Sequence, residues 1–244
     1  MTVPDPRSLR TYARTAGVLY LLIIVTAGFA EGYVRTGLVV PGDAVSTADR
    51  ILASPVLFRL GFFADLIAFV ADAAVAVLLY VVLRSAGETL ALLAAAFRLV
   101  AHPAIAALNL LHHFGALLLL EGRGALSGLD GAVREALALH SLELHGYGYV
   151  LAGAFFGVHC ALLAVLLHRS EWFPSVLGVL LGAAAIGYLF ETYAVFVQPG
   201  LEGVAAGLVV VTAGTGEVAL ALYLCFRGVR PQRAAAAAPP ASVP

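Results

Sequence analysis

The amino-acid sequence predicts an all-α fold, a polytopic transmembrane helical bundle with about six spanning helices. Of the 244 residues, 61% are hydrophobic and only 12% are charged, and the mean hydropathy is +0.97. A soluble domain carries roughly 25% charged residues. Long apolar stretches recur along the chain, and a helix needs about 20 such residues to cross a hydrocarbon core ~30 Å thick. Most of the chain is therefore expected to lie in a lipid bilayer.

The predicted spans are separated by short polar or glycine-rich segments. They cover residues 14–30, 55–84, 89–120, 146–167, 173–197 and 203–226, and the fourth is preceded by a looser helical stretch from Val133. The first span also resembles a secretory signal peptide, since arginines precede it and small residues end it. Its long apolar run without a clear A-x-A site favours a span that is retained.

Local signals mark several boundaries and one irregularity. Ser54 followed by Pro55 is typical of an N-cap with proline at the first helical position. Residues 85–88 form a tight turn, so the second and third spans are expected to be antiparallel neighbours. Pro103 interrupts the third span and predicts a kink, because proline cannot donate the backbone hydrogen bond of a regular helix.

Two longer loops and a tail complete the organisation. Residues 31–54 include the turn Pro41-Gly42-Asp43, after which Thr47 is expected to cap a short interfacial helix. Residues 121–132 are rich in glycine and form the second loop. We divide the chain into a cytoplasmic N-terminal segment (1–13), a six-span domain (14–227) and a disordered Ala/Pro-rich cytoplasmic tail (228–244).

The placement of arginine predicts the orientation. With both termini in the cytoplasm, more arginines lie on the inner side than on the outer side, as the positive-inside rule requires. The abundance of Ala, Gly and Leu and the absence of lysine favour a GC-rich bacterial genome, so the expected location is a bacterial cytoplasmic membrane. The inner set is Arg7, Arg10, Arg14, Arg84, Arg169, Arg227, Arg230 and Arg233, and the outer set is Arg35, Arg50, Arg59, Arg123 and Arg134.

Ionisable residues inside the spans form a first group near mid-membrane. Each costs about 2.5–3.5 kcal/mol on insertion, so each calls for a partner or a cavity. Counting 1.5 Å per residue from the inner helix ends places Asp72 and Arg98 at similar depths of ~16 and ~14 Å, which predicts an ion pair. The candidate network around this pair consists of His102, Asn109, His159 and Glu217.

A second group lies nearer the outer side. Glu31, Asp65 and Glu191 fall at roughly 25–27 Å by the same count, and His145 lies slightly beyond them. We expect Glu31, Asp65, His145 and Glu191 to line one polar pocket. The alternative is that Glu31 and Glu191 only reach the headgroup region and never meet.

The sequence excludes several classes of function and identifies no cofactor. A net charge of -1 and the lack of a basic stripe argue against nucleic-acid binding. No Walker loop, dinucleotide fingerprint or nucleophile elbow is present. The segment 140–145 holds metal-ligand residue types without the HExxH spacing, and Cys160 and Cys225 lie outside any CxxC motif.

Several short motifs occur along the chain together with Asp65, Asp72 and Asn109. The motifs are Val40-Pro41-Gly42-Asp43, Ile51-Leu52-Ala53, Phe58-Arg59-Leu60-Gly61, Leu92-Leu93-Ala94, Phe97-Arg98-Leu99, His145-Gly146-Tyr147-Gly148-Tyr149 and Phe155-Phe156-Gly157-Val158-His159. Taken together, they resemble a bacterial membrane-protein family catalogued as domain of unknown function 4386. The likeness covers about residues 14–199 and departs from the family pattern at Pro103 and at His112-His113. The family has no established activity. The resemblance therefore implies a membrane fold and highlights six polar residues without giving them roles.

Three hypotheses of function remain open on sequence alone. The first is a module whose polar cavity binds or passes a small ligand, ion or lipid headgroup. The second is a structural or accessory membrane protein, in which the polar groups only fix the helices. The third is a metal-assisted intramembrane hydrolase, for which about three protein ligands and one open position would be required. Apart from the lipid bilayer, the sequence identifies no ligand or partner.

Overall fold

The computed structural model describes residues 6–230, and every regular element within that range is a helix. Six helices are long and apolar enough to cross a membrane, which confirms the predicted all-α transmembrane bundle. The helices are α1 (Pro6–Gly28), α2 (Thr36–Leu38), α3 (Ala44–Ala53), α4 (Pro55–Leu83), α5 (Glu88–Leu99), α6 (Ala107–Leu120), α7 (Gly131–Arg169), α8 (Ser175–Phe196) and α9 (Glu202–Phe226), with π-helical segments at Phe29–Arg35 and Val100–Ala106 and 3-10 turns at Arg84–Ala86 and Gly124–Leu126.

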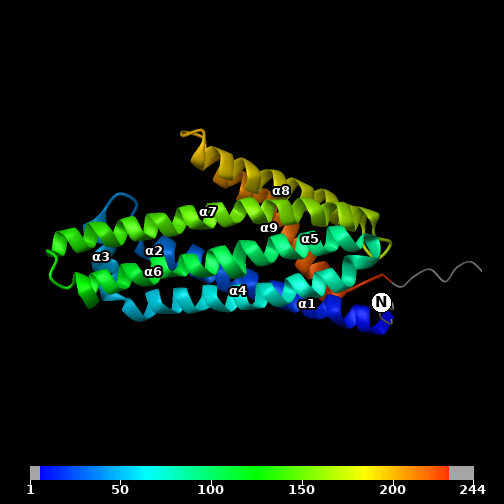
Figure 1. Cartoon of the computed structure of the whole chain (residues 1–244), viewed down its shortest axis with the longest axis horizontal. Coiled ribbons are helices and arrows are strands. Elements are labelled where there is room, and N and C mark those ends of the chain that lie inside the picture. The colour runs from blue at the N-terminus through cyan, green and yellow to red at the C-terminus, as the bar shows by residue number, and fades with distance from the viewer. Residues whose placement is uncertain (1–5, 231–244) are drawn as a thin grey trace, which may run out of the picture.

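The spanning helices form a closed ring in chain order. Each packs against the next one along the chain, and α9 returns to pack against α1 (Figure 1). At this last seam Gly17 lies directly against the backbone of Cys225, where any side chain would collide with the neighbouring helix. Small residues allow such close approach between helices in a membrane.

The two ends of the bundle differ. At the end that we call the loop end, α4, α6 and α7 extend past α8 and α9 and meet α2 and α3 (Figure 1). Helix α7 alone has 39 residues and is ~58 Å long, well beyond a hydrocarbon core of ~30 Å. A separate apolar cluster holds this end together, and it includes Val34, Ile51, Phe58 and Leu117.

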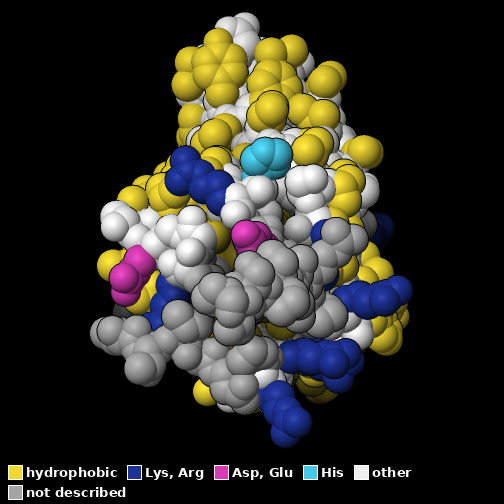
Figure 2. Space-filling model, turned by 90° about the vertical axis from the view of Figure 1, so that its right-hand side faces the viewer, with side chains coloured by type: hydrophobic (Ala, Val, Ile, Leu, Met, Phe, Trp, Pro, Cys, Tyr) yellow, Lys and Arg dark blue, Asp and Glu magenta, His cyan; other side chains and the backbone are white. Residues whose placement is uncertain are grey.

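The opposite end, the termini end, carries both ends of the described chain. A large apolar cluster fills its interior, with members from α1, α4, α5, α7, α8 and α9. Figure 2 looks onto this end, where dark-blue arginine side chains project from the surface. The exposed arginines there are Arg7, Arg10, Arg14, Arg169, Arg227 and Arg230.

Several sequence expectations need correction. The first span does not end at Ala30, because a π-helical segment carries it on through Arg35 to α2. The cap of α3 is Asp43 rather than Thr47, since an Asp43 oxygen accepts from the Ser46 backbone N–H at 2.9 Å. These hydrogen bonds from Ser46 hold the pKa of the exposed Asp43 carboxyl below its usual value. Thr47 instead bonds the backbone of Val40.

Other boundaries agree with the sequence. Pro55 is the first residue of α4, although the Ser54 side chain makes no capping hydrogen bond. Pro103 lies within the second π-helical segment, which accommodates the missing donor. The stretch from Val133 is continuous with the fourth span in α7. Most of the tail that was predicted to be disordered, from residue 231 onward, lies outside the described residues, as do residues 1–5.

Candidate functional site

Helix α4 positions two acidic side chains in the interior of the ring. Asp65 and Asp72 are seven residues apart, which is close to two turns, so both point to the same side of the helix. Both are fully buried. Each is the centre of a polar cluster, and we call these the outer cluster (around Asp65) and the inner cluster (around Asp72).

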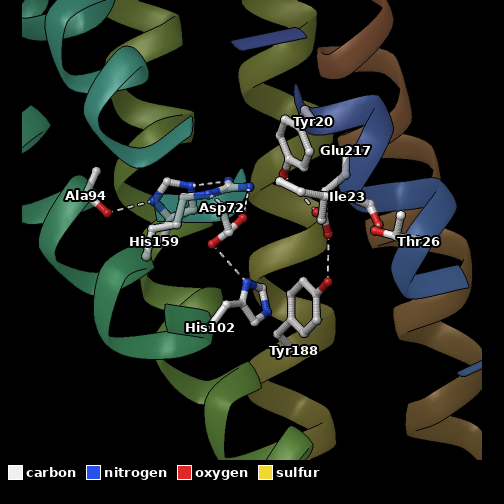
Figure 3. Close-up of polar contacts among 10 residues, drawn as sticks. Tyr20, Ile23, Thr26, Asp72, Ala94, His102, His159, Tyr188 and Glu217 are labelled. Carbon is white, nitrogen blue, oxygen red and sulfur yellow. Dashed lines mark hydrogen bonds and ion pairs between the residues drawn. The ribbon is translucent and has the colours of Figure 1, made fainter. Parts of the chain in front are cut away.

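In the inner cluster, Asp72 and Arg98 form an ion pair, as their matched depths predicted. Oδ1 of Asp72 accepts from Nε of Arg98 at 2.9 Å and from Nη2 at 2.5 Å. Oδ2 of Asp72 lies 3.1 Å from Nδ1 of His102 (Figure 3). The π-helical segment around Pro103 includes His102 and holds it at the level of Asp72.

His159 and two aromatic rings complete the surroundings of Arg98. Nδ1 of His159 lies 2.8 Å from the carbonyl oxygen of Ala94, so this nitrogen carries a proton and donates it (Figure 3). Nε2 of His159 is then free to accept from Arg98 Nη1 at 3.1 Å. The guanidinium also lies 4.4 Å from the ring centroid of Tyr20 and 5.0 Å from that of Phe156, which are cation–π distances.

Glu217 on α9 lies beside the inner cluster and binds two tyrosines. Tyr20 donates to Oε2 at 2.8 Å and Tyr188 donates to Oε1 at 2.6 Å (Figure 3). These contacts join α1, α8 and α9. Among the described residues of the inner cluster, no buried side-chain nitrogen or oxygen lacks a hydrogen-bond partner.

The outer cluster depends on Arg35, which the π-helical extension of α1 turns into the bundle. Arg35 is 6% exposed. Its Nε lies 2.5 Å from Oε2 of Glu31, one turn earlier, and its Nη1 lies 2.6 Å from Oδ2 of Asp65. The guanidinium lies 5.5 Å from the ring centroid of Tyr149 on α7. Glu31 remains largely exposed, at 65% of its side chain, whereas Asp65 is enclosed.

Two histidines extend the outer cluster toward α6. The ring of His145 lies 5.0 Å from that of Tyr149 and 5.7 Å from that of His113. Nδ1 of His145 lies 3.1 Å from the carbonyl oxygen of Asn109, and Nδ2 of Asn109 donates to the carbonyl oxygen of His145 at 2.6 Å. Nε2 of His113 lies 3.0 Å from the carbonyl oxygen of Phe58.

The outer cluster leaves buried polar atoms without partners, in contrast to the inner one. Within the described chain these atoms are Arg35 Nη2, Asp65 Oδ1, Tyr149 Oη, His145 Nε2 and His113 Nδ1. A buried polar atom without a partner costs about 1–3 kcal/mol. Tyr149 and Asp65 also interact with each other, although the geometry of a full hydrogen bond is not reached. Several unpaired polar atoms in one cluster are typical of a site that holds water or a ligand.

The structure brings some of the expected site residues together and separates others. Glu31, Asp65 and His145 belong to the outer cluster. Glu191 is half-buried on α8 and has no hydrogen bond or ion pair with any described residue. Asn109, which the sequence grouped with the Asp72–Arg98 network, bonds His145 in the outer cluster. Within the described range, no group of three or more His, Cys, Asp or Glu residues is placed so that it could hold a metal ion.

The family model of the domain of unknown function DUF4386 matches residues 15–228, which include both clusters. The chain belongs to the DUF4386 family. No curated protein and no solved structure matched this DUF4386 protein. Its six apolar helices and its family together make it a multi-pass membrane protein of unknown activity.

In this DUF4386 protein, one aromatic side chain separates the two clusters. Phe69 lies on α4 between Asp65 and Asp72 and is 4% exposed. Its ring lies 5.9 Å from that of His102 in the inner cluster and 6.1 Å from that of Tyr149 in the outer cluster. The polar interior of the DUF4386 bundle is therefore interrupted by an apolar layer.

Sequence reasoning missed Arg35, which was assigned to an outer loop, and did not connect the tyrosines to the clusters. The spacing of Glu31 and Arg35 was an available signal, because residues four apart on a helix lie next to each other. It would have indicated that the first helix continues beyond Ala30.

Proposed function

We propose that this protein is a membrane-embedded binding module, in which the outer cluster binds a small cation that carries N–H hydrogen-bond donors. The observation that supports this most directly is the contrast between the two clusters. The inner cluster pairs all its buried polar atoms, whereas Arg35, Asp65, Tyr149 and His145 each present an unpaired one. A site that only fixed helices would gain by pairing these atoms as well.

Charge and protonation favour a cationic ligand. Arg35 is paired with two carboxylates, those of Glu31 and Asp65, so the three groups together carry one net negative charge. Nδ1 of His145 donates to the carbonyl oxygen of Asn109, so its Nε2 is an acceptor. Two unpaired acceptors, Asp65 Oδ1 and His145 Nε2, thus complement an ammonium ion or a primary amine.

Binding is better supported than passage through the membrane. Phe69 blocks the interior between the outer and inner clusters. Beyond the inner cluster, the interior of the termini end is occupied by a large apolar cluster, made mostly of leucines, valines and alanines. A conduit for a polar solute would require a continuous polar lining.

A structural role is the second candidate, and the inner cluster favours it. The hydrogen bonds of the inner cluster connect most of the spans and, within the described part of the chain, leave none of its buried polar atoms unpaired. They involve Asp72, Arg98, His159, Glu217 and two tyrosines. Such networks fix helix register without doing chemistry. The two candidates make different predictions only for the outer cluster.

The proposed location is a bacterial cytoplasmic membrane with both termini in the cytoplasm. The exposed arginines at the termini end support this orientation (Figure 2). The outer cluster would then be reached from the extracytoplasmic side, where Glu31 is exposed.

The test uses the full chain in lipid nanodiscs. Thermal unfolding is measured in ammonium chloride, methylammonium chloride and sodium chloride at equal ionic strength. We expect ammonium or methylammonium to raise Tm relative to sodium, since saturation to 100 times Kd stabilises by about 2.7 kcal/mol. The rise should disappear in Asp65→Asn and weaken in Tyr149→Phe. It should persist in Glu143→Gln, which changes an exposed carboxylate on α7 outside the cluster. Equal Tm in all three salts would exclude the proposed ligand class.

A further inference from the structure

We propose that the lipid-facing side of α4 binds an anionic phospholipid, with the phosphate at Arg59 and the two acyl chains in grooves that meet at Phe63. This site is separate from the proposed amine site, and neither proposal depends on the other. It combines three observations. They are two apolar grooves, the length of the second groove along α4, and a surplus of positive charge at the loop end.

The first groove lies between α4 and α6 and encloses about 260 Å³. Its walls are aromatic and aliphatic, and Arg59 is the charged residue among those that line it. The second groove lies between α1 and α4, which pack side by side; it is shallower and more open, with a volume of about 460 Å³. Phe63 lines both grooves, so they flank it on either side of α4. Two adjacent grooves suit a lipid with two chains.

The length of the second groove matches one leaflet. On α4 it runs from Phe63 to Ala74, which at 1.5 Å per residue is ~16 Å. Half of a hydrocarbon core ~30 Å thick is ~15 Å. Arg59 lies one helical turn beyond Phe63, toward the loop end, at the level where a lipid phosphate would be found.

The charges near Arg59 complement a phosphate. Nη2 of Arg59 lies 2.5 Å from Oε1 of Glu121, and Nε of Arg123 lies 2.9 Å from Oε2 of the same residue. Two arginines thus share one carboxylate, which leaves one positive charge. No described residue accepts from Nε or Nη1 of Arg59. The side chains of Arg59 and Arg123 are 44% and 64% exposed, so a guanidinium edge is accessible for the bidentate contact that phosphate favours.

Because of this arrangement, removing Arg59 and removing Glu121 should have opposite effects on lipid binding. Arg59 binds the phosphate, so its loss should weaken lipid binding. Glu121 competes with the phosphate for Arg59 and repels it, so its neutralisation should strengthen binding. A purely structural ion pair would instead lose stability whichever partner is removed, and neither change would tighten lipid binding.

The experiment titrates phosphatidylglycerol or phosphatidylcholine into the full chain in detergent and counts retained lipids by native mass spectrometry. We expect phosphatidylglycerol to bind more tightly than phosphatidylcholine. Arg59→Gln should weaken phosphatidylglycerol about tenfold, the effect of one charge-assisted hydrogen bond, whereas Glu121→Gln should tighten it. The matched control is Arg50→Gln, an exposed arginine on α3 that lies outside both grooves.

A second measurement distinguishes binding of the whole lipid from binding of phosphate alone. Thermal unfolding is repeated with inorganic phosphate alone and with short-chain phosphatidylglycerol, and we expect protection only from the lipid. The proposal is overturned if both lipids bind equally, if Glu121→Gln weakens binding as Arg59→Gln does, or if free phosphate protects as well as the lipid.

Discussion

At the scale of single residues, the two buried arginines show how differently a membrane interior can hold a charge. Arg98 has the largest side chain among the fully buried described residues, and each of its three guanidinium nitrogens has a partner. Arg35 uses Nε and Nη1 but leaves Nη2 unpaired beside Tyr149. The first arrangement is a closed set of contacts, and the second can still accept a further partner.

The Asp72–Arg98 pair should show strong non-additivity. We expect Asp72→Asn or Arg98→Gln alone to cost about 3–5 kcal/mol, because each leaves a buried charge without its counter-charge. The double variant should cost less than the sum, since no lone charge remains. Denaturation in mild detergent measures all three, and strictly additive losses would contradict a direct pair.

Gly148 makes room for Asn109, and this can be tested against a nearby glycine. A Cβ at Gly148 would collide with the amide of Asn109, which bonds His145. Gly148→Ala should therefore cost about 1–3 kcal/mol by displacing that side chain. Gly146→Ala is the control on the same helix, because a Cβ there meets nothing within 4 Å and should leave stability unchanged or slightly raised. Equal losses at both positions would mean that the Asn109 contact is unimportant.

At the scale of helices, the two π-helical segments determine which residues reach the clusters. Regular apolar spans could be predicted from sequence, because hydrophobic length alone identifies them. The pairing of Asp72 with Arg98 could also be predicted, since a short turn fixes the register of α4 and α5. The position of Arg35 could not, because a π-helical segment rotates the residues that follow it and has no distinct composition. The segment Val100–Ala106 likewise precedes Asn109, which bonds His145 in the outer cluster although the sequence grouped it with Asp72 and Arg98.

Removing one residue from the first π-helical segment should disconnect Arg35. Each helical residue adds ~100° of rotation, so deleting Gly32 would turn Arg35 away from Asp65. We expect the deletion to destabilise the protein about as much as Arg35→Gln, and adding Arg35→Gln to the deletion should cost nothing further. Thermal unfolding gives the comparison, with deletion of Gly128 in the loop between α6 and α7 as the control. Additive losses would mean that Gly32 acts independently of Arg35.

At the scale of the whole molecule, the arginine distribution predicts the direction of insertion. Reporter fusions after Arg84, Gly128 and Arg230 should report inner, outer and inner locations respectively, because the exposed arginines collect at the termini end. Alkaline phosphatase and green fluorescent protein give opposite signals for the two sides of a bacterial membrane. A reversed pattern at all three sites would place the outer cluster on the cytoplasmic side.

The seam between α1 and α9 has a consequence for how the protein is made. The ribosome releases α1 into the membrane first and α9 last, yet Gly17 and Tyr20 acquire their partners Cys225 and Glu217 only from α9. Until α9 is made the ring stays open at this seam, and Tyr20 can contact Arg98 of α5 but lacks the carboxylate that accepts from its hydroxyl. A ribosome that stalls before residue 217 produces a chain whose first helix has no hydrogen-bond partner for that tyrosine. Such incomplete chains lack the contact between α1 and α9 that closes the ring.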